Sequence, residues 1–318
     1  ALVDRAIITA VGDMSVAANT DASILANVKS EVQASTSVGI VLAFNTIGYA
    51  PADLFHATID ALAGNSDAGN SYVASKAVIN DSALAVGGNL SVTSDWAGSV
   101  IAVIESAALA LKVNTGSSQG DGATSVTVAP VIALNKISSR TEARIIGLSD
   151  ADDNTVGGDL TVHAIGTTQI LATLESSAIS VAAGASGAQK AIGIGAVIGR
   201  NVINADSTVE VEGANAVLDV GGAALVQALD DSLIHAELYA TAVSIGAGTQ
   251  DVKAIAMAAA IARNDITSTV TASVHDLAAF QSLGSMRVEA KRLARIESIG
   301  RATAVSVALS LGSGSNPA

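Results

Sequence analysis

Oxygen-bearing side chains at alternate positions form the strongest candidate for a chemical site in this chain. Asp150, Asp152 and Asn154 belong to the segment DADDN, and hard oxygen ligands at this spacing suit Ca²⁺. The EF-hand pattern is not completed, because Thr155 replaces its glycine and Thr161 replaces its bidentate glutamate. A solvated acidic loop is the competing interpretation. We therefore expect either no cofactor or a calcium ion held by Asp150, Asp152 and Asn154.

Two glycine-containing motifs resemble catalytic or cofactor-binding signatures but lack the required context. Residues 116–120 (GSSQG) have the spacing of a serine nucleophile elbow, which needs a preceding strand, a following helix and a partner histidine. Gly193, Gly195 and Gly199 echo a dinucleotide fingerprint, which needs a helix immediately afterwards. Strands and turns are predicted after both motifs. We interpret the first as a Gly/Ser loop and the second as small residues in an inward row.

The other reactive side chains are few and scattered. The chain contains no cysteine, which excludes a thiol nucleophile and a Cys-ligated zinc. Its histidines occupy different contexts: His56, His163, His235 and His275. Trp96 and the three tyrosines do not gather into a platform for stacking on sugars. We therefore expect no catalytic residues and no enzyme activity.

Composition predicts a narrow interior. Hydrophobic residues make up 50% of the 318 residues, but aromatic residues make up only 2%. These values exclude intrinsic disorder, and no collagen or heptad period is present. The net charge of −13 argues against nucleic acid as a partner, because phosphate binding needs clustered Lys and Arg. The apolar stretches are too short for a membrane-spanning helix.

One motif recurs along the whole chain. It begins with VGDMSV at 11–16, VGGNLSV at 86–92, VGGDLTV at 156–162, VGGAALV at 220–226 and LGSMRV at 283–288. An Asn-x-Ile block ends each unit at 45–47, 135–137, 201–203 and 264–266. The repeats therefore lie near 11–85, 86–155, 156–219, 220–282 and, in part, 283–318. We expect residues 1–318 to be one continuous domain and, from the character of its two ends, a segment of a longer or processed protein.

The local period within each repeat is two, which predicts strands. Residues 208–211 (TVEV) and 266–274 (ITSTVTASV) alternate small or polar residues with β-branched ones. A unit of 62–76 residues divided by three gives coils of roughly 21–23 residues. We therefore predict an all-β fold, a parallel β-helix of roughly 14–16 coils with about three coils per repeat, forming a rod about 70 Å long. An array of β-sandwiches is the alternative.

Glycine, asparagine and proline residues have expected places in this architecture. Glycines are expected at corners where a positive φ is needed. The recurring Asn is expected to cap a turn or to adopt a left-handed conformation. Pro130 cannot donate to a strand ladder and is expected at a corner. The first repeat has roughly 20 extra residues after Asn45, which would form one additional coil.

One equivalent position carries very different side chains in successive repeats. It reads Lys29, Glu105, Glu175 and Tyr239. A mixture of both charge signs and an aromatic ring is typical of a solvent-facing position. Charge also differs along the chain, since residues 283–318 carry a net +3 and residues 1–282 carry −16. The expected partners are neighbouring coils of the same chain, other copies end to end, and a host or matrix surface ligand.

The blocks GGNLSV (87–92) and GGDLTV (157–162) resemble those of large secreted bacterial adhesins. The resemblance is to filamentous-haemagglutinin-like exoproteins and to the Ala/Val-rich repeats of leukotoxin-like giant surface proteins, and VLAFNTI (41–47) and VIALNKI (131–137) are similar to the latter. It covers nearly the whole chain, although Gly-Gly occurs only once per repeat. It implies a β-helical stalk, secretion or a cell-surface location, and a role in adhesion, biofilm or toxin delivery. It carries over no site residue.

Together these observations predict a non-enzymatic structural rod or stalk segment of a secreted or cell-surface adhesin or extracellular filament. Two alternatives remain open. One is a β-helical polysaccharide-active lyase or hydrolase. The other is a self-assembling filament subunit whose open ends stack.

Overall fold

The computed structural model describes residues 1–48, 72–115, 122–150 and 154–311. These residues form strands and turns, with no helix among them. The strands are β1 (Leu2–Asp4), β2 (Ile7–Ala10), β3 (Met14–Ala34), β4 (Thr36–Val38), β5 (Val41–Ile47), β6 (Val73–Asn80), β7 (Ala83–Val86), β8 (Leu90–Asn114), β9 (Ala123–Ile146), β10 (Asn154–Val156), β11 (Leu160–Glu212), β12 (Val217–Val220), β13 (Ala224–His275), β14 (Ala279–Ser282), β15 (Met286–Arg292) and β16 (Arg295–Ser310).

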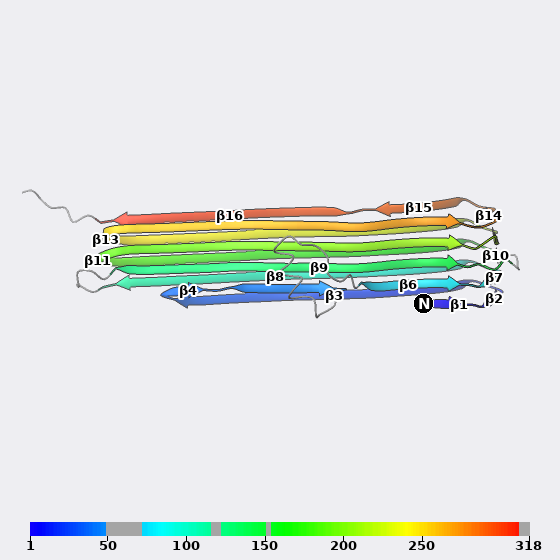
Figure 1. The fold of residues 1–318 in the computed structure, drawn as a ribbon, viewed down its shortest axis with the longest axis horizontal. Coiled ribbons are helices and arrows are strands. Elements are labelled where there is room, and N and C mark those ends of the chain that lie inside the picture. The colour runs from blue at the N-terminus through cyan, green and yellow to red at the C-terminus, as the bar shows by residue number, and fades with distance from the viewer. Residues whose placement is uncertain (49–71, 116–121, 151–153, 312–318) are drawn as a thin grey trace, which may run out of the picture.

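Each turn of the chain consists of two long strands and one short strand. An outgoing strand runs from the end that carries the short strands to a distal turn, and a return strand runs back (Figure 1). The outgoing strands are β3, β8, residues 160–184 of β11, residues 224–248 of β13, and β15 with β16. The return strands are β4 to β6, β9, residues 189–212 of β11 and residues 252–275 of β13. The short strands β2, β7, β10, β12 and β14 form their own sheet.

Successive turns stack in parallel and in register, which confirms the predicted all-β fold with parallel strands. Val162, for example, pairs with Val92 on one side and with Val226 on the other. Paired residues are thus one whole repeat apart. Each repeat therefore makes one turn, and the prediction of three coils per repeat and 14–16 coils was wrong. A coil of 21–23 residues requires short strands, whereas the outgoing strand β8 alone has 25 residues.

The direction of elongation differs accordingly from the prediction. Five outgoing strands stacked about 4.8 Å apart extend only about 20 Å along the stacking direction. A strand of 25 residues extends about 80 Å at about 3.3 Å per residue. The long axis of the described chain therefore lies along its strands (Figure 1).

The recurring Gly-Gly block marks the corner between a short strand and the next outgoing strand. Asn89 Oδ1 accepts a hydrogen bond of 2.8 Å from Asp159 N, and Asp159 Oδ1 accepts one of 2.8 Å from Ala223 N. A Cβ on Gly158 would lie 2.3 Å from Asn89 Oδ1. These corner glycines do not have the predicted positive φ and are needed because the neighbouring turn approaches so closely. The predicted positive φ does occur at Gly147, after β9, and at Gly187, between the outgoing and return parts of β11. The motif GG-[ND] therefore encodes a ladder between turns.

The recurring Asn forms a second ladder inside the molecule. Asn45 Nδ2 donates to Asn135 Oδ1, Asn135 Nδ2 to Asn201 Oδ1, and Asn201 Nδ2 to Asn264 Oδ1, at 2.7–2.8 Å. The first three of these residues are buried. The expectation of a turn cap was wrong, since these residues lie within return strands. An amide has both a donor and an acceptor, so identical side chains can bond in series along the stack.

Pro130 is accommodated within a return strand. Pro130 lies within β9 and not at a corner, opposite the break between β4 and β5, where no partner requires its missing N–H.

The strands β5 and β6 pair with consecutive parts of β9. Ile47 pairs with Ile137 and Val73 with Ser139. Only one residue of β9 lies between these partners, so β5 and β6 lie in line along the same strand. The additional coil predicted after Asn45 concerns the residues between β5 and β6. The intervening residues 49–71 lie outside the described part of the chain.

Small residues allow the outgoing and return strands to lie close together. Ser180 Oγ donates to Ser125 O at 2.9 Å, and Thr127 Oγ1 donates to Ile179 O at 2.9 Å, each across the interior. Larger apolar residues such as Leu90 and Leu160 fill the part nearest the short strands. This narrow interior explains the scarcity of aromatic residues.

Candidate functional site

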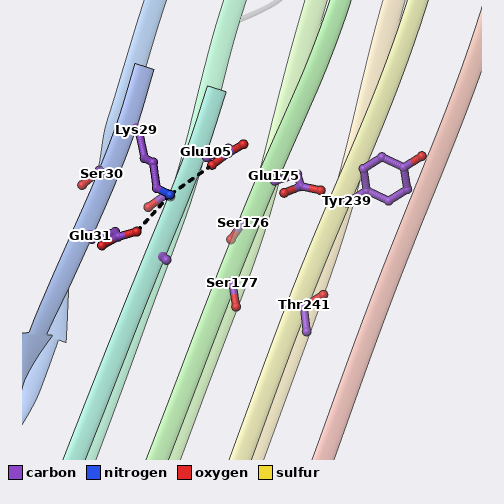
Figure 2. A pocket seen from close by; sticks show the side chains of 11 residues that line it. Lys29, Ser30, Glu31, Glu105, Glu175, Ser176, Ser177, Tyr239 and Thr241 are labelled. Carbon is purple, nitrogen blue, oxygen red and sulfur yellow. Dashed lines mark ion pairs between the residues drawn. The ribbon is translucent and has the colours of Figure 1, made fainter. Parts of the chain in front are cut away.

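A row of polar side chains crosses the outer face of the outgoing strands. Glu175 is in register with Glu105 on one side and with Tyr239 on the other, and Lys29 and Arg301 extend the row. The register confirms that Lys29, Glu105, Glu175 and Tyr239 are equivalent, and these four side chains point outward as the sequence predicted. With the row two residues further along, the four residues line a shallow hollow of about 180 Å³, which we call the polar groove (Figure 2).

The first part of the polar groove is an exposed charged cluster. Lys29 Nζ lies 3.1 Å from Glu31 Oε1 and 3.8 Å from Glu105 Oε2 (Figure 2). The hydrogen bond from Lys29 to Glu31, reinforced by the charges of Glu31 and Glu105, raises the pKa of Lys29 above its usual value. These side chains are exposed, so their ion pairs stabilise the fold little. Their carboxylates remain accessible to a ligand.

The other end of the row contains an aromatic ring and a histidine network. Tyr239 OH donates to Glu237 Oε2 at 3.1 Å, and the Arg301 guanidinium lies 5.9 Å from the Tyr239 ring centroid. His235 Nδ1 lies 2.9 Å from Glu297 Oε2, and its Nε2 lies 3.2 Å from Glu237 Oε1. The hydrogen bond to Glu297, followed by that to Glu237, raises the pKa of His235. This network links β13 to β16.

The polar groove presents carboxylate oxygens, which accept hydrogen bonds, and the ring of Tyr239. Such groups can contact hydroxyl-rich or cationic ligands. Glu105 and Glu175 are on neighbouring strands, about 4.8 Å apart at the backbone. Glu105 is 42% exposed, so its carboxylate is hydrated in the absence of a ligand. The carboxylates of the groove are therefore open to solvent.

The three residues of the calcium prediction differ in their surroundings. Asp150 is exposed, and Asp152 lies outside the described residues. Asn154 is fully buried in β10, where its Oδ1 accepts a hydrogen bond from Leu84 N at 3.0 Å and its Nδ2 donates to Ser149 O at 3.0 Å. The Asn154 amide thus joins the short strand to its neighbours. The calcium site stays a prediction, with Asp150 as its exposed candidate ligand.

The other residues singled out in the sequence do not meet at one place. Gly195 faces inward, where a Cβ would lie 2.5 Å from Thr241 O, and this confirms the small inward row. Trp96 is buried, and Tyr72 OH accepts a hydrogen bond from Arg140. Desolvation lowers the pKa of half-buried His163. Tyr49, His56 and residues 116–120 lie outside the described part of the chain.

The buried carboxyl group of Asp230 and the hydrogen-bond network of His235 were not predicted from the sequence. Asp230 is fully buried on an inward position of β13, and its Oδ1 accepts a hydrogen bond from Ser232 Oγ at 2.8 Å. Burial is the main reason that the pKa of Asp230 is raised. The alternation of inward and outward positions could have shown that Asp230 points inward. The 62-residue offset between the last repeats could have shown that His235 pairs with Glu297.

Within the described ranges, no helix is long and apolar enough to cross a membrane. Comparisons of the chain with protein-family models, with curated proteins and with solved structures find no match.

Proposed function

We propose that this chain is a non-enzymatic structural segment of a secreted or cell-surface adhesin or extracellular filament. One observation carries the proposal: the polar side chains that recur at equivalent positions in most repeats are those that join one turn to the next. The Asp and Asn residues of the Gly-Gly corners and the buried Asn ladder both bond along the stack. The outward row that contains the polar groove, in contrast, changes from Lys to Glu to Tyr, and then to Arg beside the groove.

A stacked solenoid suits this role for a physical reason. Each turn contacts only its neighbours, so the scaffold can be lengthened by adding repeats without redesigning a central core. Its outer faces stay available for different side chains, because the inter-turn bonds that recur from repeat to repeat are made by inward and corner residues. The resemblance of the GG-[ND]-L-[ST]-V block to that of secreted bacterial adhesins agrees with such a scaffold.

Two measurements test the proposal. Fractionation of the source cells, with an antibody against residues 1–318, should place the protein in the extracellular or surface fraction. Purified residues 1–318 should bind to a subset of immobilised matrix proteins, glycans or host cells without changing them chemically. A purely intracellular location, or catalytic turnover of any of these ligands, would contradict the proposal.

The polar groove supports one alternative, a polysaccharide-active enzyme. Glu105 and Glu175 stand on neighbouring strands at a backbone spacing of about 4.8 Å. In glycosidases that retain configuration, the two carboxyl groups are about 5–5.5 Å apart. Incubation with acidic and neutral glycans, followed by an assay for new reducing ends or unsaturated products, decides between the two functions. Cleavage that is lost in Glu105→Gln and Glu175→Gln variants would establish the enzyme.

A further inference from the structure

An apolar panel covers part of the outer face of the return strands. It consists of the outward positions of residues 36–42, 126–132, 192–198 and 255–261, which lie side by side in four neighbouring strands. Leu42 is 55% exposed, and Ile261 is 57% exposed. None of these outward positions carries a charge. Four strands with four outward positions each span about 19 by 27 Å, or roughly 500 Å².

The opposite face of the molecule has a second apolar area, next to the distal turn. It consists of the outward positions of residues 109–113, 179–183, 243–247 and 305–309 in neighbouring outgoing strands. Leu111 is 51% exposed and Leu309 is 53% exposed. Both outer faces therefore carry apolar areas of a size that on soluble monomers usually marks an interaction site.

The two faces differ in the sign of their charge. The return strands carry eight Lys and Arg residues and five Asp and Glu residues, a net charge of +3. The five outgoing strands carry ten Asp and Glu residues and seven Lys and Arg residues, a net charge of −3, and of these residues only Asp230 is buried. A return face and an outgoing face are thus electrostatically complementary, whereas two return faces repel each other.

The order of apolar and charged positions also matches between the two faces. From the distal turn inward, the return part of β11 has its apolar positions at 192–198 and then Arg200. From the same end, the outgoing part of β11 has apolar positions at 183–179, then Ser177 and Glu175. A shift of about four residues, or about 13 Å, between stacked copies therefore places apolar side chains on apolar side chains and Arg200 over Glu175.

We propose that this chain binds a second copy of itself laterally, with the return face of one copy on the outgoing face of the next. Flat sheets pack face to face about 10 Å apart. A stable interface buries about 800 Å² on each partner, which the panel of roughly 500 Å² and its charged surroundings together reach. Such a contact joins different surfaces, so it adds copies in an open series. The proposal is independent of the proposed function, since a lateral array forms whether or not the chain is part of an adhesin.

Sedimentation velocity of residues 1–318 at several concentrations and ionic strengths tests the association. The wild-type chain should form a concentration-dependent series of oligomers, and salt should shift it toward monomer because the faces attract by charge. Ile194→Lys places a cation in the middle of the panel and should give monomer. The matched control is Asn204→Lys, which adds the same charge to an outward position of the same strand beyond the panel. Circular dichroism should show both variants folded.

Mixing variants distinguishes this contact from the other arrangements. Val181→Lys blocks the apolar area of the outgoing face and should also be monomeric alone. A mixture of Ile194→Lys and Val181→Lys chains should form dimers, because each contributes the face that the other lacks. Dimers of Val181→Lys alone would show that two return faces meet and would overturn the proposal. So would a monomeric wild-type chain, or oligomers that persist in Ile194→Lys, which would point to stacking through the strand edges.

Discussion

Asn135 and Asn201, 66 residues apart in the chain, are joined by a buried hydrogen bond of 2.8 Å from Asn135 Nδ2 to Asn201 Oδ1. Asn135 also accepts a hydrogen bond from Asn45, so each amide in the middle of the ladder is used on both sides. A buried amide that loses its partner cannot bond to water instead. The ladder therefore links the stability of one turn to that of the next.

Asn135→Ala should destabilise the protein more than a change at the end of the ladder. It leaves the Asn45 donor and the Asn201 acceptor without partners in the interior, at a cost of about 2–6 kcal/mol for the two groups. Asn264→Ala, at the end of the ladder, removes only one bond and should cost less. Denaturant unfolding followed by circular dichroism measures both. Asn204→Ala, on an outward position, is the control, and equal effects of all three substitutions would contradict the ladder's role.

Gly158→Ala should break the corner ladder, whereas Gly12→Ala should be tolerated. A Cβ at Gly158 would lie 2.3 Å from Asn89 Oδ1, which accepts the hydrogen bond from Asp159 N, while a Cβ at Gly12 meets nothing within 4 Å. The expected loss for Gly158→Ala is about 1–3 kcal/mol, as for other overpacked sites. Thermal unfolding of the two variants provides the comparison. A smaller loss at Gly158 than at Gly12 would show that close approach does not explain the Gly-Gly motif.

Asp230→Asn should stabilise the protein at neutral pH and leave it unchanged in acid. Burial raises the pKa of Asp230 above its ordinary value of 3.8, so the folded state favours the protonated carboxyl group. The stability that this preference contributes is present below pH 3.8 and is lost as the pH rises through the folded-state pKa. Above that pKa an ionised carboxylate is buried, and its removal should gain about 1–3 kcal/mol.

Thermal melts of Asp230→Asn at pH 3 and pH 7 measure this difference. Asp231→Asn is the control, because Asp231 is the exposed neighbour on the same strand. If the midpoint of Asp230→Asn did not rise at pH 7 relative to the wild type, the carboxylate would have a partner that stabilises it.

The contact between β13 and β16 should weaken as the pH rises through the pKa of His235. Glu297 and Glu237 raise this pKa, so the protonated imidazole stabilises the contact below the unfolded-state value of 6.5 and the contribution disappears above the folded-state pKa. A histidine NMR titration measures the pKa directly. Glu297→Gln should lower it toward 6.5, while Glu289→Gln, which changes another acid in the last outgoing strand, should not move it.

The all-β fold, the parallel stacking of repeats and the equivalence of Lys29, Glu105, Glu175 and Tyr239 were predictable from the sequence. The spacing of the repeats equals the offset of the paired strands, so aligning VGGNLSV with VGGDLTV already aligns the strands. The alternation of small and larger residues likewise shows which side chains point inward. Both features are local or periodic, and a periodic pattern is visible without coordinates.

The path of the chain within one repeat was not predictable in the same way. A run of alternating residues shows that a strand exists but does not show where the strand ends. The pattern therefore predicts three short coils where the structure has one turn with a strand of 25 residues. The roles of Asn135 and Gly158 depended on which side chain of the next turn approaches them. Likewise, Glu297 reaches His235, and Arg200 and Glu175 belong to opposite faces, only because the turns stack in this register. By itself the sequence determined the repeating unit and its inward face. The tertiary structure decided the length of each turn, the two ladders and the surfaces that are left exposed, because these follow from contacts between residues more than 60 positions apart.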